Sequence, residues 1–509
     1  MERLEGHLRR RGSWYVAVAS LLYIALTAIT AYRRPLWYDE LFTFHVARQE
    51  RVADVLHALA AGADIHPPLD YVLRHYSMRL LGPGELSDRL PSILAFWLMC
   101  LALRRIVAQR CGAVLGIAAF LAPLSTLAYD YAYEGRGYAL MLAGSSVALA
   151  GWQAAAAGNR RPVSLAIMGL GLATAVTVHY YGLFVFIPLI AGEAVRARSR
   201  RKVDVALTLV AAGSALSFLL NMPFLVVQAA QTGKIWSSAS VTGTIQAYGW
   251  LLSETALVLP LFLVLAAAAC IIDSGAALER SIAAAVPAHE WSAAVAAVFV
   301  PVACFLLARF ATVAFNHRYM LVTILGVVLA GAFLAHHIFA GSARLRVALL
   351  AAVALAGAYE MVRTARESDD AGAGRARQAA VEWALPDRSL PVVHGTRTSF
   401  MEATRYATPA LHPTMYYLTN REASLRWVGN DNGQWAMDNI APLVPGQVMD
   451  YGAFLGRHGR FLLVNPRLAK DWILPQLLDD GAQIFYRAVV GENVVLEVRL
   501  PPPGVRSSP

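Results

Sequence analysis

The stretch that decides the fold is WYVAVASLLYIALTAITAY, residues 14–32. It carries no charged residue, and its length is close to the roughly 20 apolar residues that cross a bilayer as a helix. An arginine run at 9–11 precedes it, and Arg33 and Arg34 follow it directly. A cleaved signal peptide would have a shorter apolar core and a small-residue cleavage site. We therefore predict a retained first transmembrane helix whose N-terminus lies in the cytoplasm.

Further apolar blocks of similar length follow the first one. They lie at about 90–108, 113–128, 137–157, 163–180, 182–195, 203–225, 250–272, 291–312, 319–338 and 346–363. With the first block they predict a polytopic α-helical membrane protein with about eleven transmembrane helices.

Basic residues divide the loops between these blocks into two kinds. The loops that we assign to the cytoplasm carry Arg104, Arg105, Arg110, Arg160, Arg161, Arg196, Arg198, Arg200, Arg201, Lys202, Arg280, Arg344 and Arg346. The short outer loops hold little more than Arg136, Lys234 and Arg318. Because cytoplasmic loops are enriched in Lys and Arg, we predict a multi-pass membrane protein with a cytoplasmic N-terminus and a C-terminal domain on the outer side.

The composition agrees with this assignment. Of 509 residues, 57% are hydrophobic and only 15% are charged, with a mean hydropathy of +0.48. A soluble domain has about a quarter charged residues. The net charge of +10 lies mostly in short runs between apolar blocks, so it reflects membrane topology and does not indicate a nucleic-acid partner. The four cysteines are widely spaced, and their spacing supports neither a disulfide framework nor a zinc site.

Two outer segments are long. The first, residues 33–89, contains an amphipathic stretch from Leu41 to Leu59 and a second that begins at Pro67-Pro68, where proline suits a helix start. Helices of this kind tend to lie in the membrane interface. The segment belongs to the transmembrane domain, which we place at residues 1–363.

The second outer segment is the tail, residues 364–509, which reads as an extracytoplasmic domain. Strand-like runs occur at 390–394, 461–464 and 484–490, and the last continues through Gly491-Glu492-Asn493 into 494–498 as a predicted hairpin. Residues 474–478 look helical. We predict a small α/β domain.

The first candidate site residues are Asp39 and Glu40, in the run WYDE at 37–40 just outside the first helix. A carboxylate there would take a proton from an attacking hydroxyl, or help to hold a divalent cation. The alternative is that both acids stabilise the first turn of a helix.

Two further polar motifs lie on the same predicted face. The segment DIHPPLDY at 64–71 contains His66, which would ligate a metal, contact a phosphate, or simply precede a helix. The segment YDYAYEGRGY at 129–138 contains Asp130, Glu134, Arg136 and Tyr138. Arg136 offers a planar fork for phosphate, and the alternative is an aromatic belt with an internal Arg–Glu pair.

The last motif is FNHRY at 315–319, where His317 and Arg318 enter an apolar block from the outer side. An arginine here opposes the topology rule, which favours a bound anion, and snorkelling is the alternative. The outer loop at 228–236 adds Lys234. Carboxylates and isolated cations on one membrane face would suit a lipid-phosphate substrate, with its tail between helices and its phosphate at a cation.

Taken in order, these motifs are similar to those of a known family. The runs YDEL at 38–41, HPPLDY at 66–71 and DRLPS at 88–92 resemble the GT-C glycosyltransferases of the protein O-mannosyltransferase and aminoarabinose transferase superfamily. EGRGYAL at 134–140 is similar to a Glu-Ala-Arg-Pro-Tyr-Ala-Leu run of bacterial members, although glycine replaces the usual proline at 137. Arg318-Tyr319 resembles the Arg-Tyr pair that opens a late helix there. The tail resembles the outer domain of that family only in position and size.

The resemblance implies an inverting transfer of a hexosyl or pentosyl unit from a polyprenyl-phosphate-linked donor. The acceptor would be an envelope lipid, glycan or protein. Asp39 would be the catalytic base or orient the acceptor, Glu40 would assist it, and His66 would border the site. Arg136, Arg318 and Lys234, in that order, would bind the donor phosphate, and Asp130, Glu134, Tyr138 and His317 would line the site. Metal use varies in this family; Asp39, Glu40 and His66 would be the ligands of any Mg²⁺ or Mn²⁺.

Two other classes remain open from the residues. A secondary transporter or flippase of a lipid-linked anion often shows paired halves and broken helices at the membrane midplane. The third class is a membrane scaffold whose exported tail binds a partner. Formation of a new glycosidic bond separates the enzyme from both.

Overall fold

The computed structural model describes residues 2–231, 239–253, 286–312, 315–340, 342–370, 372–468 and 470–501, together with positions 258, 261, 262 and 264. The chain divides into two compact units. The helical unit comprises Met1–Ala31, Arg89–Met222 and Ser237–Ser368, and the α/β unit comprises Tyr32–Asp88, Pro223–Trp236 and Asp369–Pro509. Lys234, Arg280 and most of the block predicted at 250–272 lie outside the described residues.

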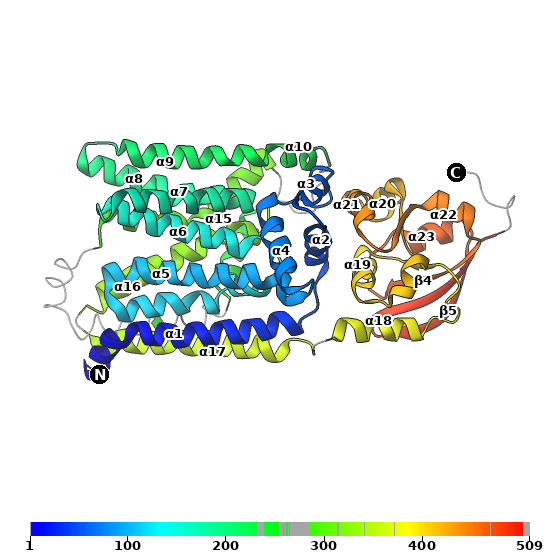
Figure 1. The fold of residues 1–509 in the computed structure, drawn as a ribbon, viewed down its shortest axis with the longest axis horizontal. Helices are drawn as coiled ribbons and strands as arrows, with labels where there is room; N and C mark the ends of the chain where they lie inside the picture. Colours follow the sequence, from blue (N-terminus) through cyan, green and yellow to red (C-terminus); the bar gives the residue numbers. More distant parts are fainter. Residues whose placement is uncertain are drawn as a thin grey trace. The chain divides into compact units, whose positions relative to one another are not determined.

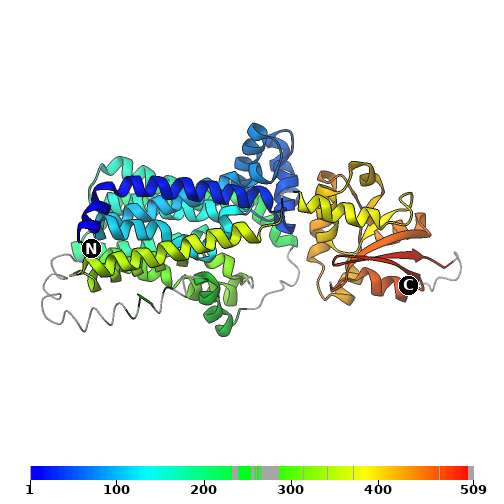
Figure 2. The ribbon, with the colours of Figure 1, turned by 90° about the horizontal axis from the view of Figure 1, so that it is seen from below.

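The helical unit contains long helices that run roughly parallel to one another (Figure 1, Figure 2). Their bounds are α1 (Glu2–Arg33), α5 (Glu85–Leu121), α6 (Tyr138–Ala156), α7 (Arg161–Val178), α8 (Phe186–Arg200), α9 (Val205–Leu216), α11 (Val241–Leu252), α14 (Ala288–Val298), α15 (Val300–Leu307), α16 (Val322–Ile338) and α17 (Ala343–Glu367). Shorter turns of 3-10 or π helix connect them: η1 (Ala122–Ser125), η2 (Leu127–Tyr133), η3 (Tyr180–Val185), η4 (Ser217–Asn221), η5 (Ala308–Thr312) and η6 (His317–Met320).

These helices confirm the polytopic α-helical class. Within the described residues, seven helices are long and apolar enough to cross a membrane, or eight if α14 and α15, bent by 49° at their junction, form one span. The helix α16 is apolar but shorter than the others. The sequence-based number of eleven spans stays a prediction.

One of the seven, Glu85–Ser125, is 41 residues long. A straight helix of that length would extend about 60 Å, twice the hydrocarbon thickness. It breaks at Gly112, whose φ of 83° and ψ of 174° are not helical. A Cβ built on Gly116 would lie 2.7 Å from the Cβ of Ala108, whereas eight residues of straight helix separate Cα atoms by about 12 Å. The chain therefore turns back at Gly112, between the blocks predicted at 90–108 and 113–128.

Small residues allow the helices α6 and α7 to approach closely. A Cβ on Gly171 would lie 2.6 Å from the backbone nitrogen of Ala148, and one on Gly144 would lie 2.7 Å from the carbonyl oxygen of Gly171. Close backbone approach is the usual way in which transmembrane helices gain packing energy, because lipid tails are as apolar as the side chains. Tyr138, at the start of α6, and His179, just after α7, lie at the same end of this pair.

The α/β unit contains the predicted small α/β domain. Its sheet has the strand order β3-β2-β1-β4-β6-β5. The strands are β1 (Val392–His394), β2 (Met415–Thr419), β3 (Gln447–Asp450), β4 (Arg460–Pro466), β5 (Gln483–Val490) and β6 (Asn493–Arg499). The first four are parallel to their neighbours in the order 3-2-1-4, and β5 and β6 form the predicted hairpin.

Alternate residues of the strands face two different cores, so helices cover both faces of the sheet (Figure 2). On one face Val393 and Leu463 pack with Phe454 and Leu477. On the other face Val392 and its neighbours pack with Val381 of α18. The helices of this domain are α18 (Ala373–Trp383), α19 (Arg397–Tyr406), α20 (Arg421–Trp427), α21 (Asn432–Ile440), α22 (Tyr451–Arg457) and α23 (Ile473–Asp479), with 3-10 turns η7 (Pro409–Thr414) and η8 (Ala441–Leu443).

The first outer segment supplies the rest of the α/β unit. Its helices are α2 (Tyr38–Ala47), α3 (Val52–Ala60) and α4 (Pro68–Leu81), and α10 (Met222–Gln231) adds a further helix. As predicted, α4 begins at the Pro67-Pro68 pair. The stretch predicted from Leu41 to Leu59 is two helices, because the chain leaves the helix between Ala47 and Val52.

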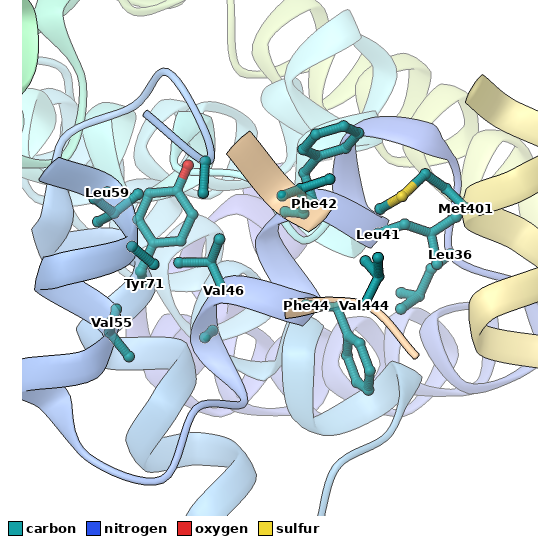
Figure 3. Packing of buried hydrophobic residues seen from close by; sticks show 14 of the residues in the cluster. Leu36, Leu41, Phe42, Phe44, Val46, Val55, Leu59, Tyr71, Met401 and Val444 are labelled. Atoms are coloured by element: carbon teal, nitrogen blue, oxygen red, sulfur yellow. The ribbon is translucent and has the colours of Figure 1, made fainter. Parts of the chain in front are cut away.

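These helices share a core with the C-terminal domain (Figure 3). Leu41, Phe44 and Tyr71 are fully buried in one cluster with Met401 and Ile440. Burying each large apolar side chain contributes roughly 1.5–3 kcal/mol, so the cluster fixes α2 firmly against α19. The helix α2 is buried from Glu40 to Ala47, whereas α3 and α4 expose apolar residues, of which Leu80 is 82% exposed. The prediction of interfacial helices therefore remains for α3 and α4.

Candidate functional site

The candidate residues in the helical unit gather around Tyr138, the first residue of α6. The ring of Tyr138 lies 4.6 Å from that of Tyr131 in η2 and 4.8 Å from that of His179, between their centroids. Tyr138 interacts electrostatically with Tyr319, Arg136, Arg318 and Glu134. The structure therefore brings together two arginines and a carboxylate from the motifs at 129–138 and 315–319.

Backbone contacts fix the loop that carries Glu134 and Arg136. The hydroxyl of Ser92, in α5, donates to the carbonyl oxygen of Glu134 at 2.7 Å and is 3.4 Å from that of Arg136. Thr126 caps η2 by accepting from the backbone N–H of Ala128. The Arg136 side chain lies in the interior, with 4% of the residue exposed. A buried guanidinium is costly unless anionic or hydrogen-bonding groups surround it.

Arg318 joins the same cluster from η6, about 180 residues further along the chain. Asn316 caps η6, and its side-chain oxygen accepts from the backbone N–H of Arg318 at 3.1 Å. The next ring, Tyr319, stacks on Tyr181 with centroids 4.0 Å apart and planes 8° apart. Arg318 is half-buried, and it interacts electrostatically with Tyr131 as well as Tyr138.

The remaining candidates of the helical unit lie at the edge of this cluster. The Tyr133 hydroxyl donates to Asp130 at 2.5 Å. His317 stacks on Trp250, with centroids 5.4 Å apart, and burial together with the nearby Arg318 lowers the pKa of its imidazole. Burial raises the pKa of the Tyr131 phenol, and the carboxylate of Glu134 acts in the same direction. Tyr131 therefore stays a neutral hydrogen-bonding group.

The candidates of the first outer segment gather around Tyr38, in the α/β unit. The phenol of Tyr38 interacts electrostatically with Arg397, Asp39, Tyr417 and Asp64. The Arg397 guanidinium lies over the Tyr38 ring, 5.2 Å from its centroid. Desolvation raises the pKa of the Tyr38 phenol, although Arg397 opposes the shift. Asp39 is half-buried at the start of α2, where the helix dipole favours a carboxylate.

Glu40 has a structural role in this arrangement. Its carboxylate accepts from the backbone N–H of Trp37 at 3.1 Å, which closes a capping box at the start of α2. The residue is 1% exposed. Of the two roles considered for the acid pair, stabilising the first turn of a helix fits Glu40. Its capping box fixes the turn that also contains Asp39.

His66 lies beside the same group of residues. It is buried, and its Nδ1 is 3.9 Å from a carboxylate oxygen of Asp64. Among the described residues, no three His, Cys, Asp or Glu side chains are grouped as a metal ion would require, so Asp39, Glu40 and His66 do not form a ready set of ligands. Lys234 lies outside the described residues.

Sequence reasoning missed several residues of these clusters. His179 and Tyr181 lie where the predicted blocks 163–180 and 182–195 meet, and neither was a candidate. In the structure His179 accepts from the Tyr181 N–H at 3.2 Å, and both rings join the cluster at Tyr138. Arg397 was missed because it belongs to the predicted extracytoplasmic domain, and arginine is common on the surface of such domains. The high tyrosine content around 129–138 and 179–181 was the available signal.

The chain thus combines a unit of helices long and apolar enough to cross a membrane with an α/β unit. Two solved structures are similar to the chain: ArnT from Cupriavidus metallidurans in the apo state, and the same protein bound to undecaprenyl phosphate. Both are 13% identical to it; the first has a TM-score of 0.60 over 96% of this chain and 98% of ArnT, and the second 0.57 over 95% and 98%. No protein-family model matches the chain, and no curated protein sequence matches it significantly. The GT-C fold expected from the motifs is thereby confirmed.

Proposed function

We propose that the protein is an inverting glycosyltransferase of the outer face of the bacterial inner membrane. It transfers a hexosyl or pentosyl unit from a polyprenyl-phosphate-linked donor to an envelope lipid, glycan or protein. The observation that carries the proposal is the convergence of Arg136 and Arg318 on Tyr138 in a GT-C fold. The N-terminus is then cytoplasmic and the C-terminal domain periplasmic, as the loop charges predict.

The donor phosphate needs cations where the leaving group develops charge. Arg136 and Arg318 supply two planar forks that suit phosphate oxygens, and Lys234 is the third candidate. Tyr138 interacts with both arginines and Tyr131 with Arg318, and the apolar surface of such rings strengthens the interaction of a cation with an anion. ArnT, which has the same fold, binds undecaprenyl phosphate.

The acceptor hydroxyl needs a base, and we assign that role to Asp39. The acceptor oxygen attacks the anomeric carbon from the face opposite the phosphate. A new C–O bond forms, the bond between the anomeric carbon and the phosphate oxygen breaks, and the hydroxyl proton passes to Asp39. Polyprenyl phosphate leaves as an anion at the arginines. One displacement inverts the anomeric configuration.

The other candidate residues support these two roles. Glu40 caps α2 and so positions Asp39. His66 and its neighbour Asp64 border the acceptor side, near Tyr38. Asp130, Glu134, Tyr138 and His317 line the donor side. A divalent cation is not required for the transfer as written, because the arginines neutralise the leaving group.

The proposal is tested with purified protein in liposomes, radiolabelled polyprenyl-phosphate sugars and an envelope extract as acceptor. Asp39→Asn keeps the size of the side chain and removes the base, so we expect transfer to fall by about 100-fold or more. Glu50→Gln, at an exposed acid after α2, is the matched control and should keep the wild-type rate. Transfer by Asp39→Asn at the wild-type rate would exclude Asp39 as the base. Movement of labelled lipid without a new glycosidic bond would indicate the transporter or flippase instead.

A further inference from the structure

The C-terminal domain contains a cavity that the transfer reaction as described does not use. Its volume is about 860 Å³, within the range of small-molecule sites. It is lined by the residues that follow β1, from Gly395 to Ser399, and by residues that follow β4, including Pro466 and Trp472. The strands β1 and β4 are adjacent and parallel.

This position has a topological reason. From β1 the chain proceeds outward to β2 and β3 on one side, and then returns to place β4 on the other side of β1. The connections after β1 and β4 therefore diverge to opposite sides and leave a crevice at the carboxyl ends of the strands. Open α/β sheets bind their ligands at such a switch point. The cavity lies where the topology places a site.

Two charged side chains of α19, Arg397 and Glu402, line this cavity. In the part of the chain that the structure describes, neither the Arg397 guanidinium nor the Glu402 carboxylate makes a hydrogen bond or ion pair, and both residues are half-buried. Burial raises the pKa of the Glu402 carboxyl, which Arg377 opposes and Glu492 reinforces. A half-buried carboxyl and a half-buried guanidinium that lack hydrogen bonds favour the binding of a ligand that hydrogen-bonds to both.

A third polar group, the side chain of Asn465, lies next to the wall of the cavity. Asn465, at the end of β4, is 7% exposed, and its Nδ2 donates to Asp471 at 2.8 Å. Its Oδ1 has no hydrogen-bond partner among the described residues. That oxygen occupies the place that a side chain on Gly395 would take, and Gly395 lines the cavity. The oxygen is itself buried, so the glycine leaves room for it directly beneath the wall of the cavity.

The balance of charge in the lining selects among ligand classes. Its charged residues are Arg377, Arg397, Lys470, Glu402, Asp471 and Glu492. Three are basic and three are acidic, so the lining has no excess of positive charge to hold a phosphate or another strong anion. Planar guanidinium, carboxylate and amide groups instead match pairs of neighbouring hydroxyl groups, because each can make two parallel hydrogen bonds.

Two lining residues of the cavity, Arg397 and Tyr417, also interact with Tyr38. Arg397 lies over the ring of Tyr38, whose neighbour in the chain is Asp39. Tyr417, another lining residue, interacts electrostatically with Tyr38. A ligand that fills the cavity and extends past Arg397 would bring its free end to Asp39.

We propose that this cavity binds the carbohydrate part of the acceptor, so that the acceptor is a glycan or a glycan-bearing lipid. The inference rests on the proposed glycosyl transfer and adds the substrate class to it. The sugar units already present would lie between β1 and β4, and the hydroxyl to be modified would lie at Asp39. Arg397 and Glu402 act as binding and positioning residues in this arrangement.

The test is isothermal titration of the full chain in detergent, in an Asp39→Asn background that prevents turnover. The probes are di- to tetrasaccharides released by mild acid from envelopes of cells that lack the protein, and inorganic pyrophosphate. We expect saturable oligosaccharide binding that Glu402→Gln and Arg397→Gln each weaken by about 10-fold, the loss of one charge-assisted hydrogen bond. Arg457→Gln, at an exposed arginine of α22 outside the cavity, should bind within about 2-fold of the parent.

Binding that both cavity variants leave unchanged, or no saturable binding, would overturn the proposal. Binding of pyrophosphate alone would overturn it too, because it would identify an anion site. Arg397 packs on Tyr38, so Glu402→Gln keeps the test decisive if the replacement of Arg397 alters folding. Sugar transfer by the wild type without oligosaccharide binding would remove this inference and leave the proposed function intact. If no sugar is transferred from the lipid donor, the proposed function itself fails, whatever the titration shows.

Discussion

The candidate-site arginines of the helical unit differ from most charged residues of the α/β unit. In the helical unit, Arg136 and Arg318 lie among tyrosine rings at the ends of apolar helices. In the α/β unit, charged residues are abundant, and most of them stabilise the domain. Glu497, for example, is paired with Arg460, Arg487 and Arg499. The cavity residues Arg397 and Glu402 differ from that majority because, in the described part of the domain, they make no ion pair.

The comparison teaches which charges are informative. A charge at the end of an apolar helix costs free energy unless it serves a purpose, so its presence alone suggests a function. A charge on an α/β domain costs little, and only its lack of a partner distinguishes it. The same residue type therefore has to be judged by its sequence in one unit and by its contacts in the other.

The largest effect should come from the arginine buried in the helical unit. Arg136→Gln removes the cation that we place at the leaving phosphate while it keeps a polar side chain in the same position. Loss of one such group typically costs 100-fold to 1000-fold in turnover, and we expect sugar transfer to fall by about that factor. Arg344→Gln, at an exposed arginine of α17, removes the same charge outside the cluster and should keep full activity. If the Arg136→Gln and Arg344→Gln variants had equal activity, Arg136 would have no special role at the leaving phosphate.

A smaller effect is expected where the helical unit depends on packing. Gly171→Val would push a side chain into the backbone of Ala148 and Gly144 in α6. Overpacking of this kind costs roughly 1–3 kcal/mol, so the midpoint of thermal unfolding in detergent should fall. Gly213→Val is the matched control, because no atom of the described residues lies within 4 Å of a Cβ built there. The account of helix packing would be wrong if both variants unfolded at the same temperature.

The smallest effect concerns the paired charges of the α/β unit and depends on pH. Hydrogen bonds from Arg460 and Arg499 lower the pKa of the Glu497 carboxyl from 4.5 to about 2. A lowered pKa in the folded state stabilises it above pH 4.5, and that stabilisation is lost as the pH falls toward 2. Glu497→Gln should therefore be less stable than the wild type at pH 7, and the gap should close between pH 4.5 and 2. Unfolding in denaturant measures this difference in the free energy of unfolding. A difference that does not change with pH would mean that packing, and not the charge of Glu497, causes it.

The parts of the fold that could be predicted are those with a strong local pattern. Apolar blocks identified most of the helices, the proline pair at 67–68 identified the start of α4, and the run 484–498 identified the hairpin of β5 and β6. The strands β2 and β3 were missed. The residues of β2 are all buried and show no alternation, and β3 is only four residues long.

The site shows the same division. The motifs located Arg136 and Arg318, because charge contrasts with an apolar surrounding. They left two roles open for Glu40, and only the hydrogen bond to Trp37 assigns it to capping. The position of Arg397 over Tyr38 joins segments that are far apart in the sequence. No local pattern encodes such a contact, which depends on how the first outer segment packs against α19.

The measurement that tests the central claim most directly is the affinity of the purified protein for undecaprenyl phosphate compared with undecaprenol, determined by native mass spectrometry. If Arg136 and Arg318 hold the donor phosphate, the wild type should prefer the phosphate by about 10-fold or more, since each hydrogen bond to a charged group contributes roughly 1.5–3 kcal/mol. The variant with both Arg136→Gln and Arg318→Gln should bind the two lipids equally. Equal binding of the two lipids by the wild type, or an undiminished preference in the double variant, would contradict the account.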